Sequence, residues 1–284
     1  MSTRTQYEAD LAALKGSLAR MSRLSADAVE DALEALCTAD AEEAKGIVKG
    51  DTEVNRMERD IEHRCMTLLL RQQPVASDLR FISAAMKVVT DVERIGDHAA
   101  DIAEIVPHLA GVRKAGDPAV SRSIEMGRKA HKMLQDAMSA FAAEDEAAAK
   151  AVIDADDAVD YDFNTIKRML AAEIAADPGK VDAALDVLMV IKYLERIGDH
   201  AVNIAEVGGV PARRAGITTR RLFCSSCFPS FSFPRKAAAR GGRQSFALSE
   251  TPSRKILEFF SCLMQFPARL RRIISRSLPT EGRL

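Results

Sequence analysis

The stretch that decides the fold is Glu93-Arg-Ile-Gly-Asp-His-Ala99, because the same seven residues return from Glu195 to Ala201. The match continues to Glu104 and Glu206, and only two of the twelve aligned positions differ. A motif repeated at a fixed distance is the signature of an internal duplication. The sequence around the two copies should therefore fold twice into the same unit.

The duplication extends upstream of this motif. At an offset of 105 residues Asp51 aligns with Asp156, and after a three-residue deletion in the following loop the offset becomes 102. Each repeat contains three long amphipathic segments with short connections, which makes neighbouring helices antiparallel. We therefore expect an all-α protein with two tandem three-helix bundles, at residues 5–112 and 117–208, followed by an irregular basic tail at residues 209–284.

Apolar residues spaced by three and four predict the core-facing stripe of the helices. The predicted stripes contain Leu11, Leu14, Leu18 and Met21; Ile47, Val54, Met57, Ile61, Cys65 and Leu68; Leu79, Ile82, Met86 and Val89; Ile124, Met133 and Phe141; and Leu185, Leu188 and Ile191.

Capping residues and prolines predict where helices begin and end. Asp40, followed by Glu43, should cap the second helix in a capping box, and Asp117 should cap the fourth. Pro74 separates the second helix from the third. The remaining boundaries are expected near Pro107, at about Glu144 and Ala176, and at about Val181.

Composition narrows the class of protein. An apolar content of 47% with no Trp suits a soluble globular protein rich in helix. The first residues lack the apolar core of a secretory signal, and no apolar run is long enough to span a bilayer. The five unevenly spaced Cys fit a reducing compartment, so we expect a cytoplasmic protein.

The repeated motif places acids where the helical pattern requires core residues. The stripe of the third helix continues past Val89 to Glu93 and Asp97, and the sixth helix leads in the same way to Glu195 and Asp199. A carboxylate that faces into a bundle costs several kcal/mol unless it meets a cation or several hydrogen-bond donors. The motif therefore predicts a positive partner in each repeat.

Two facing ladders of oxygen-bearing side chains, one helical turn apart, are a plausible metal site in each repeat. The candidate ligands are Glu93, Asp97 and Asp101 with Asp51 and Asn55, called here the first acidic site, and Glu195 and Asp199 with Asp156 and Asp160, called the second acidic site. Oxygen ligands suit Fe, Mn, Mg or Zn. The alternative is structural ion pairing with Arg94 and Arg196, which could also bind an anion.

Two other repeated residue pairs leave alternatives open. Gly96 and Gly198 each cost about 1 kcal/mol inside a helix, so they indicate either a close approach between helices or a hinge. His98 and His200 lie round the helix from the preceding Glu and should face a groove or solvent, although ligation stays possible.

No catalytic constellation accompanies these acids. None of the five His follows a Glu by three residues, and neither a phosphate-binding Gly loop nor a Gly-x-Ser-x-Gly motif is present. We therefore expect a protein that is not an enzyme. A metal-dependent enzyme and a structural helical module with an acidic binding face remain the alternatives.

The two copies of Glu-Arg-Ile-Gly-Asp-His-Ala-x-x-Ile-Ala-Glu, each on the third helix of its unit, resemble the PhoU family of phosphate-uptake regulators. The resemblance covers roughly residues 5–208. It implies metal clusters on the acidic motifs, a homodimer, and a role in restraining a phosphate ABC transporter and its sensor histidine kinase. It implies no nucleic-acid binding, and membrane association only through those partners.

This chain departs from the family pattern in two places. Asn203 stands where Asp101 stands in the first repeat, which should weaken metal binding at the second acidic site. The helical pattern also stops at Gly208, although its counterpart in the first repeat continues.

The tail differs chemically from the rest of the chain. Residues 209–284 contain 15 Lys and Arg, three Asp and Glu, and eight of the eleven Phe. This composition would suit a membrane or nucleic-acid surface. Because the change falls inside an unfinished helix, we instead expect a poorly ordered, out-of-frame extension. Cys224 and Cys227 lack the second ligand pair of a zinc site.

Overall fold

The computed structural model describes residues 3–72, 74, 76–113 and 116–208. Within these residues it contains six α-helices and no strand ladder. The helices are α1 (Thr3–Thr38), α2 (Ala41–Gln72), α3 (Ala76–Leu109), α4 (Pro118–Ala143), α5 (Glu146–Ala176) and α6 (Val181–Gly208), with a short 3₁₀ turn at Pro178–Lys180. The predicted tail lies outside the described residues.

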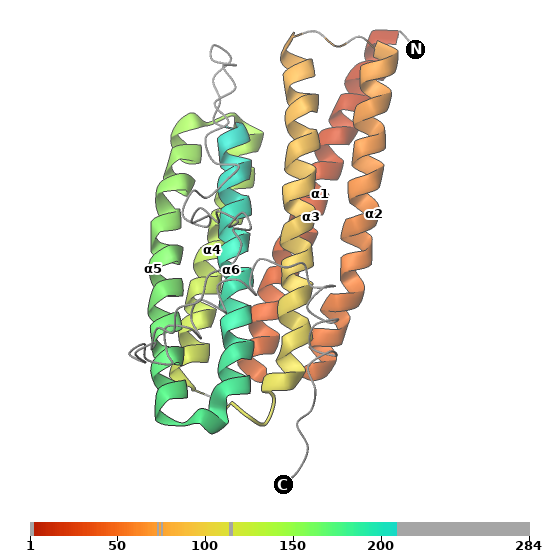
Figure 1. Cartoon of the computed structure of the whole chain (residues 1–284). Helices are drawn as coiled ribbons and strands as arrows, with labels where there is room; N and C mark the ends of the chain where they lie inside the picture. Colours follow the sequence, from red (N-terminus) through yellow and green to blue (C-terminus); the bar gives the residue numbers. More distant parts are fainter. Residues whose placement is uncertain (1–2, 73, 75, 114–115, 209–284) are drawn as a thin grey trace, which may run out of the picture. The chain divides into compact units, whose positions relative to one another are not determined.

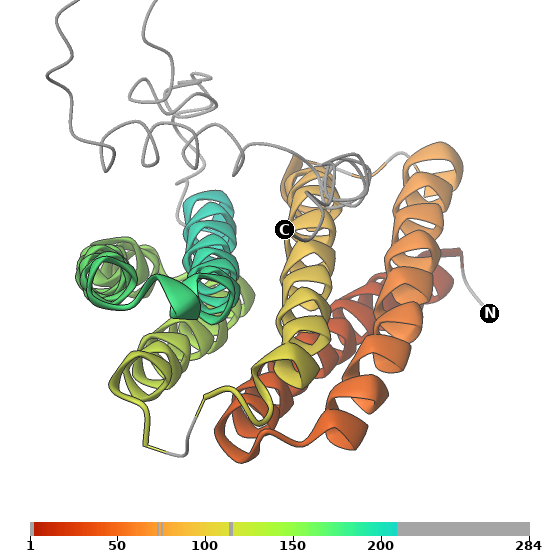
Figure 2. The same cartoon turned by 60° about the horizontal axis from the view of Figure 1, so that its bottom comes forward.

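The helices form two three-helix bundles, α1–α3 and α4–α6 (Figure 1). α2 packs on α1 and α3 of its own repeat, and α5 packs on α4 and α6. The repeats meet where α3 contacts α6 and α1 contacts α4, and Figure 2 shows α3 and α6 between the outer helices α2 and α5. The predicted all-α fold of two duplicated bundles is confirmed.

Most predicted core residues are buried, and the second helix follows its predicted stripe completely. Ile47, Val54, Met57, Ile61, Cys65 and Leu68 are each at most 8% exposed. Full burial of one such side chain contributes about 1.5–3 kcal/mol. The amphipathic face of α2 therefore holds it against α1 and α3.

The buried faces of α3 and α6 differ in part from the predicted stripes. Leu79 is exposed, and the half-buried Asp78 beside it faces α1, where its carboxylate accepts a hydrogen bond from Tyr7. Met86, Leu185 and Leu188 are only half-buried. The buried row of α6 contains small residues such as Ala184, which a search for large apolar residues overlooks.

The predicted helix caps are present. The carboxylate of Asp40 accepts hydrogen bonds from the backbone N–H groups of Glu42 and Glu43, at 2.8 and 3.2 Å. The N–H of Asp40 itself donates to Ala35, so the capping box is only half formed. Asp117 caps α4 through Ala119 and Val120.

Two predicted boundaries shift. Glu144 adopts a left-handed conformation that ends α4, and α5 begins at Glu146 after the cap Asp145. α3 continues through Pro107 to Leu109.

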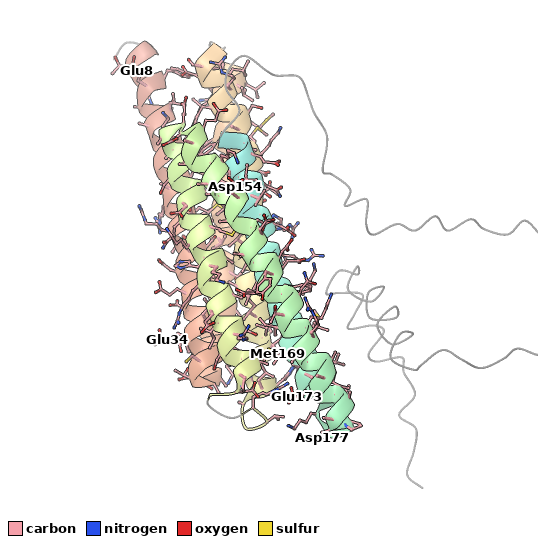
Figure 3. All side chains as sticks on the ribbon, turned by 90° about the vertical axis from the view of Figure 1, so that its left-hand side faces the viewer. Glu8, Glu34, Asp154, Met169, Glu173 and Asp177 are labelled. Atoms are coloured by element: carbon pink, nitrogen blue, oxygen red, sulfur yellow. The ribbon has the colours of Figure 1, made fainter. Side chains whose placement is uncertain are left out.

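The connection between the repeats is tied to α5 by a buried arginine. The guanidinium of Arg113 donates to Asp117 at 2.9 Å and to Glu173 at 2.9 and 3.0 Å, and its side chain is 7% exposed. Glu173 lies near the C-terminal end of α5, where Figure 3 shows it between Met169 and Asp177. These bonds fix the direction in which the chain leaves the first bundle.

Gly127 allows α4 to approach the first bundle closely, and a larger residue there should destabilise the protein. A Cβ atom at this position would lie 2.3 Å from Cδ2 of Leu33 on α1 and 3.2 Å from Cδ2 of Leu194 on α6. We expect Gly127→Val to lower the free energy of unfolding by about 1–3 kcal/mol in denaturant titrations, because the leucines cannot both move aside.

Gly46→Ala is the control for this substitution. Gly46 has open space around its Cβ position, so the better helix propensity of Ala should raise stability by about 0.5–1 kcal/mol. A Gly127→Val protein as stable as the wild type would show that α1 and α4 are not held this closely together.

Candidate functional site

Close helix approach at two glycines brings the acidic ladders of each repeat together. A Cβ at Gly96 of α3 would lie 3.2 Å from Val54 and 3.4 Å from the Asp51 carboxylate on α2. A Cβ at Gly198 of α6 would lie 3.4 Å from the equivalent Asp156 carboxylate on α5. The interpretation as a point of close approach is therefore confirmed for Gly96, whereas a Cβ at Gly198 would make ordinary contacts. An aspartate lies over each of them.

The first acidic site contains two buried carboxylate oxygens that accept no hydrogen bond. Glu93 is only 8% exposed, and its Oε2 lies 3.4 Å from Nε of Arg94 without hydrogen-bond geometry. Oδ1 of Asp51 is likewise buried without a hydrogen-bond partner. The other oxygen of Asp51 accepts a hydrogen bond from Asn55 at 2.6 Å. Unsatisfied buried oxygens of this kind are rare in folded proteins and leave room for a further donor or cation.

Burial and neighbouring carboxylates disfavour the charged form of these acids. Burial and the nearby charge of Asp97 raise the pKa of Glu93 to about 7. Burial and Asp97 also raise the pKa of Asp51. Both carboxylates therefore resist ionisation, which a bound cation would favour.

The two remaining acids of the first acidic site differ in their contacts. Asp97 forms an ion pair with Arg94 at 2.8 Å, as the structural interpretation predicted. Asp101 lies 3.6 Å from Nδ1 of His98. Ion pairing thus accounts for Asp97, but it leaves Glu93 and Asp51 without a comparable partner.

The second acidic site is arranged differently. The ammonium group of Lys192 bonds to Glu195, one turn along α6, and lies over the ring of Phe163 at 5.5 Å from its centroid. Among the described residues no ion pair joins Arg196 to Asp199, so that predicted pair is wrong.

Two other acids of this site remain poorly compensated. Burial and Asp160 raise the pKa of Asp156 to about 6. Desolvation by the surrounding protein and the negative charge of Glu195 raise the pKa of Asp199 to about 6, although Asp199 is exposed at the surface.

Both acidic sites offer the oxygen ligands that hard cations prefer. Within the described part of the chain, no three His, Cys, Asp or Glu side chains already converge on one point. Metal binding would therefore require the carboxylates to turn towards a shared centre. The unpartnered oxygens of Glu93 and Asp51 fit this requirement, and Asp97 would contribute by exchanging Arg94 for the metal.

The two motif histidines lie in the groove between the repeats. His98 is 8% exposed and stacks on Tyr193, with ring centroids 5.5 Å apart. Its ring centroid is 5.6 Å from that of His200, which hydrogen-bonds Asp91 at 2.8 Å. The prediction of a groove position is confirmed, and the histidines contribute to the packing of α3 against α6.

Sequence reasoning missed three residues beside the acidic sites. Glu58 of α2 acts electrostatically on Glu93 and Asp97, while Phe163 and Lys192 occupy the surroundings of the second site. Identical residues in the two repeats predicted the acidic sites, whereas Glu58 aligns with Phe163 and Lys192 aligns with Thr90. A comparison of the aligned positions that differ between the repeats is the signal that identifies these residues.

In the described helices, no segment has both the length and the apolar character that crossing a membrane requires.

Comparisons with known proteins place this architecture in one group. The family model "PhoU domain" matches residues 18–106 and 124–208. The accessory protein PhoU homologue of Pseudomonas aeruginosa, named for a phosphate-specific transport system, is 37% identical over 220 residues, covering 75% of this chain and 90% of the relative. The homologue of Clostridium acetobutylicum is 37% identical and is covered to 93%.

Two solved structures have the same fold. The crystal structure of PhoU from Pseudomonas aeruginosa matches with a TM-score of 0.68 and 36% identity, over 71% of this chain and 96% of that one. The PhoU structure from Streptococcus pneumoniae matches with a TM-score of 0.65 and 29% identity, over 71% and 94%.

The raised pKa of Glu93 predicts that metal-free protein loses stability as pH rises. A carboxyl group with a folded pKa near 7 and an unfolded pKa near 4.5 stabilises the fold below the unfolded pKa, and this contribution disappears as pH rises towards 7. We expect the free energy of unfolding to fall by on the order of 1–3 kcal/mol more in wild type than in Glu93→Gln between pH 5.5 and 8, measured with chelator.

The comparison with Glu93→Gln is necessary because His98 acts in the opposite direction. Burial lowers the pKa of His98, so its contribution to stability increases with pH over part of this range. Both proteins share that contribution. Equal pH slopes in the two proteins would exclude an unusual pKa at Glu93.

Proposed function

Because the chain belongs to the PhoU family, we propose that it regulates phosphate uptake as a non-catalytic, metal-binding accessory protein of a phosphate transport system. The relatives are named as accessory proteins of a phosphate-specific transport system. This chain covers nine-tenths or more of the length of the first two. The matched length includes both repeats and therefore both acidic sites.

The observation that carries the metal-binding part is the pair of unpartnered oxygens on Glu93 and Asp51. A divalent or transition metal such as Fe, Zn, Mn or Mg would supply the missing positive charge and crosslink α2 to α3. Glu93, Asp97 and Asp101 with Asp51 and Asn55 would hold it at the first acidic site. Glu195, Asp199, Asp156 and Asp160 would do so at the second.

The proposed partners are a phosphate ABC transporter and its sensor histidine kinase, engaged from the cytoplasm by a homodimer. An adaptor needs a rigid scaffold and a bound state that partners can distinguish. Metal binding would provide such a bound state by fixing α2 on α3. A ligand changes a conformational equilibrium only through its different affinities for the two conformations.

Two other functions use the same carboxylates. A metal-dependent enzyme would need an open coordination position next to a substrate pocket. A cavity of about 270 Å³ between α2 and α3 does not include the acidic ligands and is lined by Ala44, Lys45, Val48, Lys49, Ala103, Glu104 and Pro107. A purely structural module would use the acids as a charged surface, and its binding would be weakened by salt instead of by chelators.

Removal of the first acidic site should remove bound metal. We expect purified full-length protein to contain divalent or transition metal by elemental analysis, and Glu93→Ala with Asp97→Ala to reduce the content strongly, because the double variant removes two candidate ligands of α3. Glu30→Ala with Glu34→Ala is the matched control, since these acids have the same spacing but are exposed on α1, where Figure 3 labels Glu34. Metal-free wild-type protein with normal regulation would contradict metal binding.

Chelation should separate the adaptor from the charged-surface module. In a pull-down of the transporter and kinase by the full chain, we expect EDTA to reduce capture several-fold while moderate salt has a smaller effect. Added metal should restore capture by wild type but not by the Glu93→Ala, Asp97→Ala variant. Capture that ignores EDTA and decreases steeply with salt would favour the charged-surface module.

A further inference from the structure

Three aligned positions beside the two acidic sites differ in charge, although three of the candidate ligands in each repeat are the same. Around the first acidic site stand Glu58, Glu62 and Thr90, with a net charge of −2. The aligned residues around the second are Phe163, Lys167 and Lys192, with a net charge of +2. Other aligned positions change in the opposite direction, among them Arg56 to Tyr161, Met57 to Asp162 and Arg59 to Asn164. The contrast therefore lies in the contacts of particular side chains and not in a summed charge.

Contacts in the structure show what this exchange does. Lys167 and Lys192 both lie over the ring of Phe163, at 5.3 and 5.5 Å from its centroid. The ammonium group of Lys192 lies over this ring and also bonds to Glu195. Glu195 is the counterpart of Glu93, whose buried Oε2 accepts no hydrogen bond and lies 3.4 Å from the guanidinium of Arg94. The second repeat therefore holds a bonded ammonium group against the equivalent carboxylate.

We propose that Lys192 is an intramolecular cation that competes with metal at the second acidic site, and that the first acidic site is the tight metal site. This inference rests on the metal binding proposed above and adds the residue that makes the two sites unequal. The ammonium group and the unpartnered Oε2 of Glu93 are independent observations, and they indicate the same need for positive charge at equivalent positions.

Glu58 strengthens the contrast. Its charge acts on both Glu93 and Asp97, so it adds negative potential to the first acidic site. Phe163 stands in its place in the second repeat and instead supports Lys192 through a cation–π contact. Lys192 is 23% exposed, which makes its charge harder to displace than that of a fully solvated lysine.

Reciprocal substitutions between the repeats test this inference on the full-length protein. Mn²⁺ titrated calorimetrically into chelator-treated wild type should bind in two classes, with affinities at least about tenfold apart. Lys192→Met keeps the apolar stem but removes the charge, so it should raise the affinity of the weaker class about tenfold or more. Lys192→Arg keeps the charge and should leave the two classes unequal.

The converse variant is Thr90→Lys, which places an ammonium group three residues before Glu93 as Lys192 stands before Glu195. We expect it to weaken the tight class by at least about tenfold and to raise the melting temperature of the metal-free protein. This thermal shift does not depend on metal. A folding defect would be visible in the same melting curves.

The outcomes separate this inference from the proposed function. Two classes of equal affinity in wild type, or unchanged binding in Lys192→Met, would overturn the role of Lys192 while leaving metal binding intact. Unchanged tight binding in Thr90→Lys would do the same. Absence of Mn²⁺ binding in wild type and in every variant would overturn both.

Discussion

The contact between an aspartate of one helix and a glycine of the next is the constraint on which the rest of this structure depends. Asp51 lies over Gly96 and Asp156 over Gly198, at the same point of the two repeats. Without a side chain on the glycine, two helix backbones approach closely enough for carboxylates on both to share one electrostatic environment. The penalty of a glycine inside a helix, about 1 kcal/mol, is the cost of this arrangement.

The helical fold could be predicted because its determinants are local and repeated. The stripe of α2, the caps Asp40 and Asp117, and the duplicated motif each follow from spacing within one segment. The prediction for Leu79 was wrong because the orientation of the first turn of α3 is set by Tyr7 of α1, which is 71 residues from Asp78. Distant contacts of this kind leave no periodic signal.

The residues of the acidic sites could be predicted from the sequence, but the ion-pair and hydrogen-bond partners of these acids could not. An acid in a core position indicated that Glu93 would be buried, and it is. Whether such an acid has a partner depends on residues from other helices, such as Glu58, or on a single lysine one turn away, such as Lys192. Three ligands are thus the same in both repeats, while the side chains that contact them are not.

The hydrogen bond between His200 and Asp91 joins residues 109 positions apart in the sequence. Each three-helix bundle, in contrast, is held together by helices that follow one another along the chain. Contacts of short sequence separation form faster, because less chain entropy is lost when their loops close. The order of folding is therefore built into the duplication: each repeat can collapse by itself, and the surface between α3 and α6, with its paired histidine rings, should assemble last.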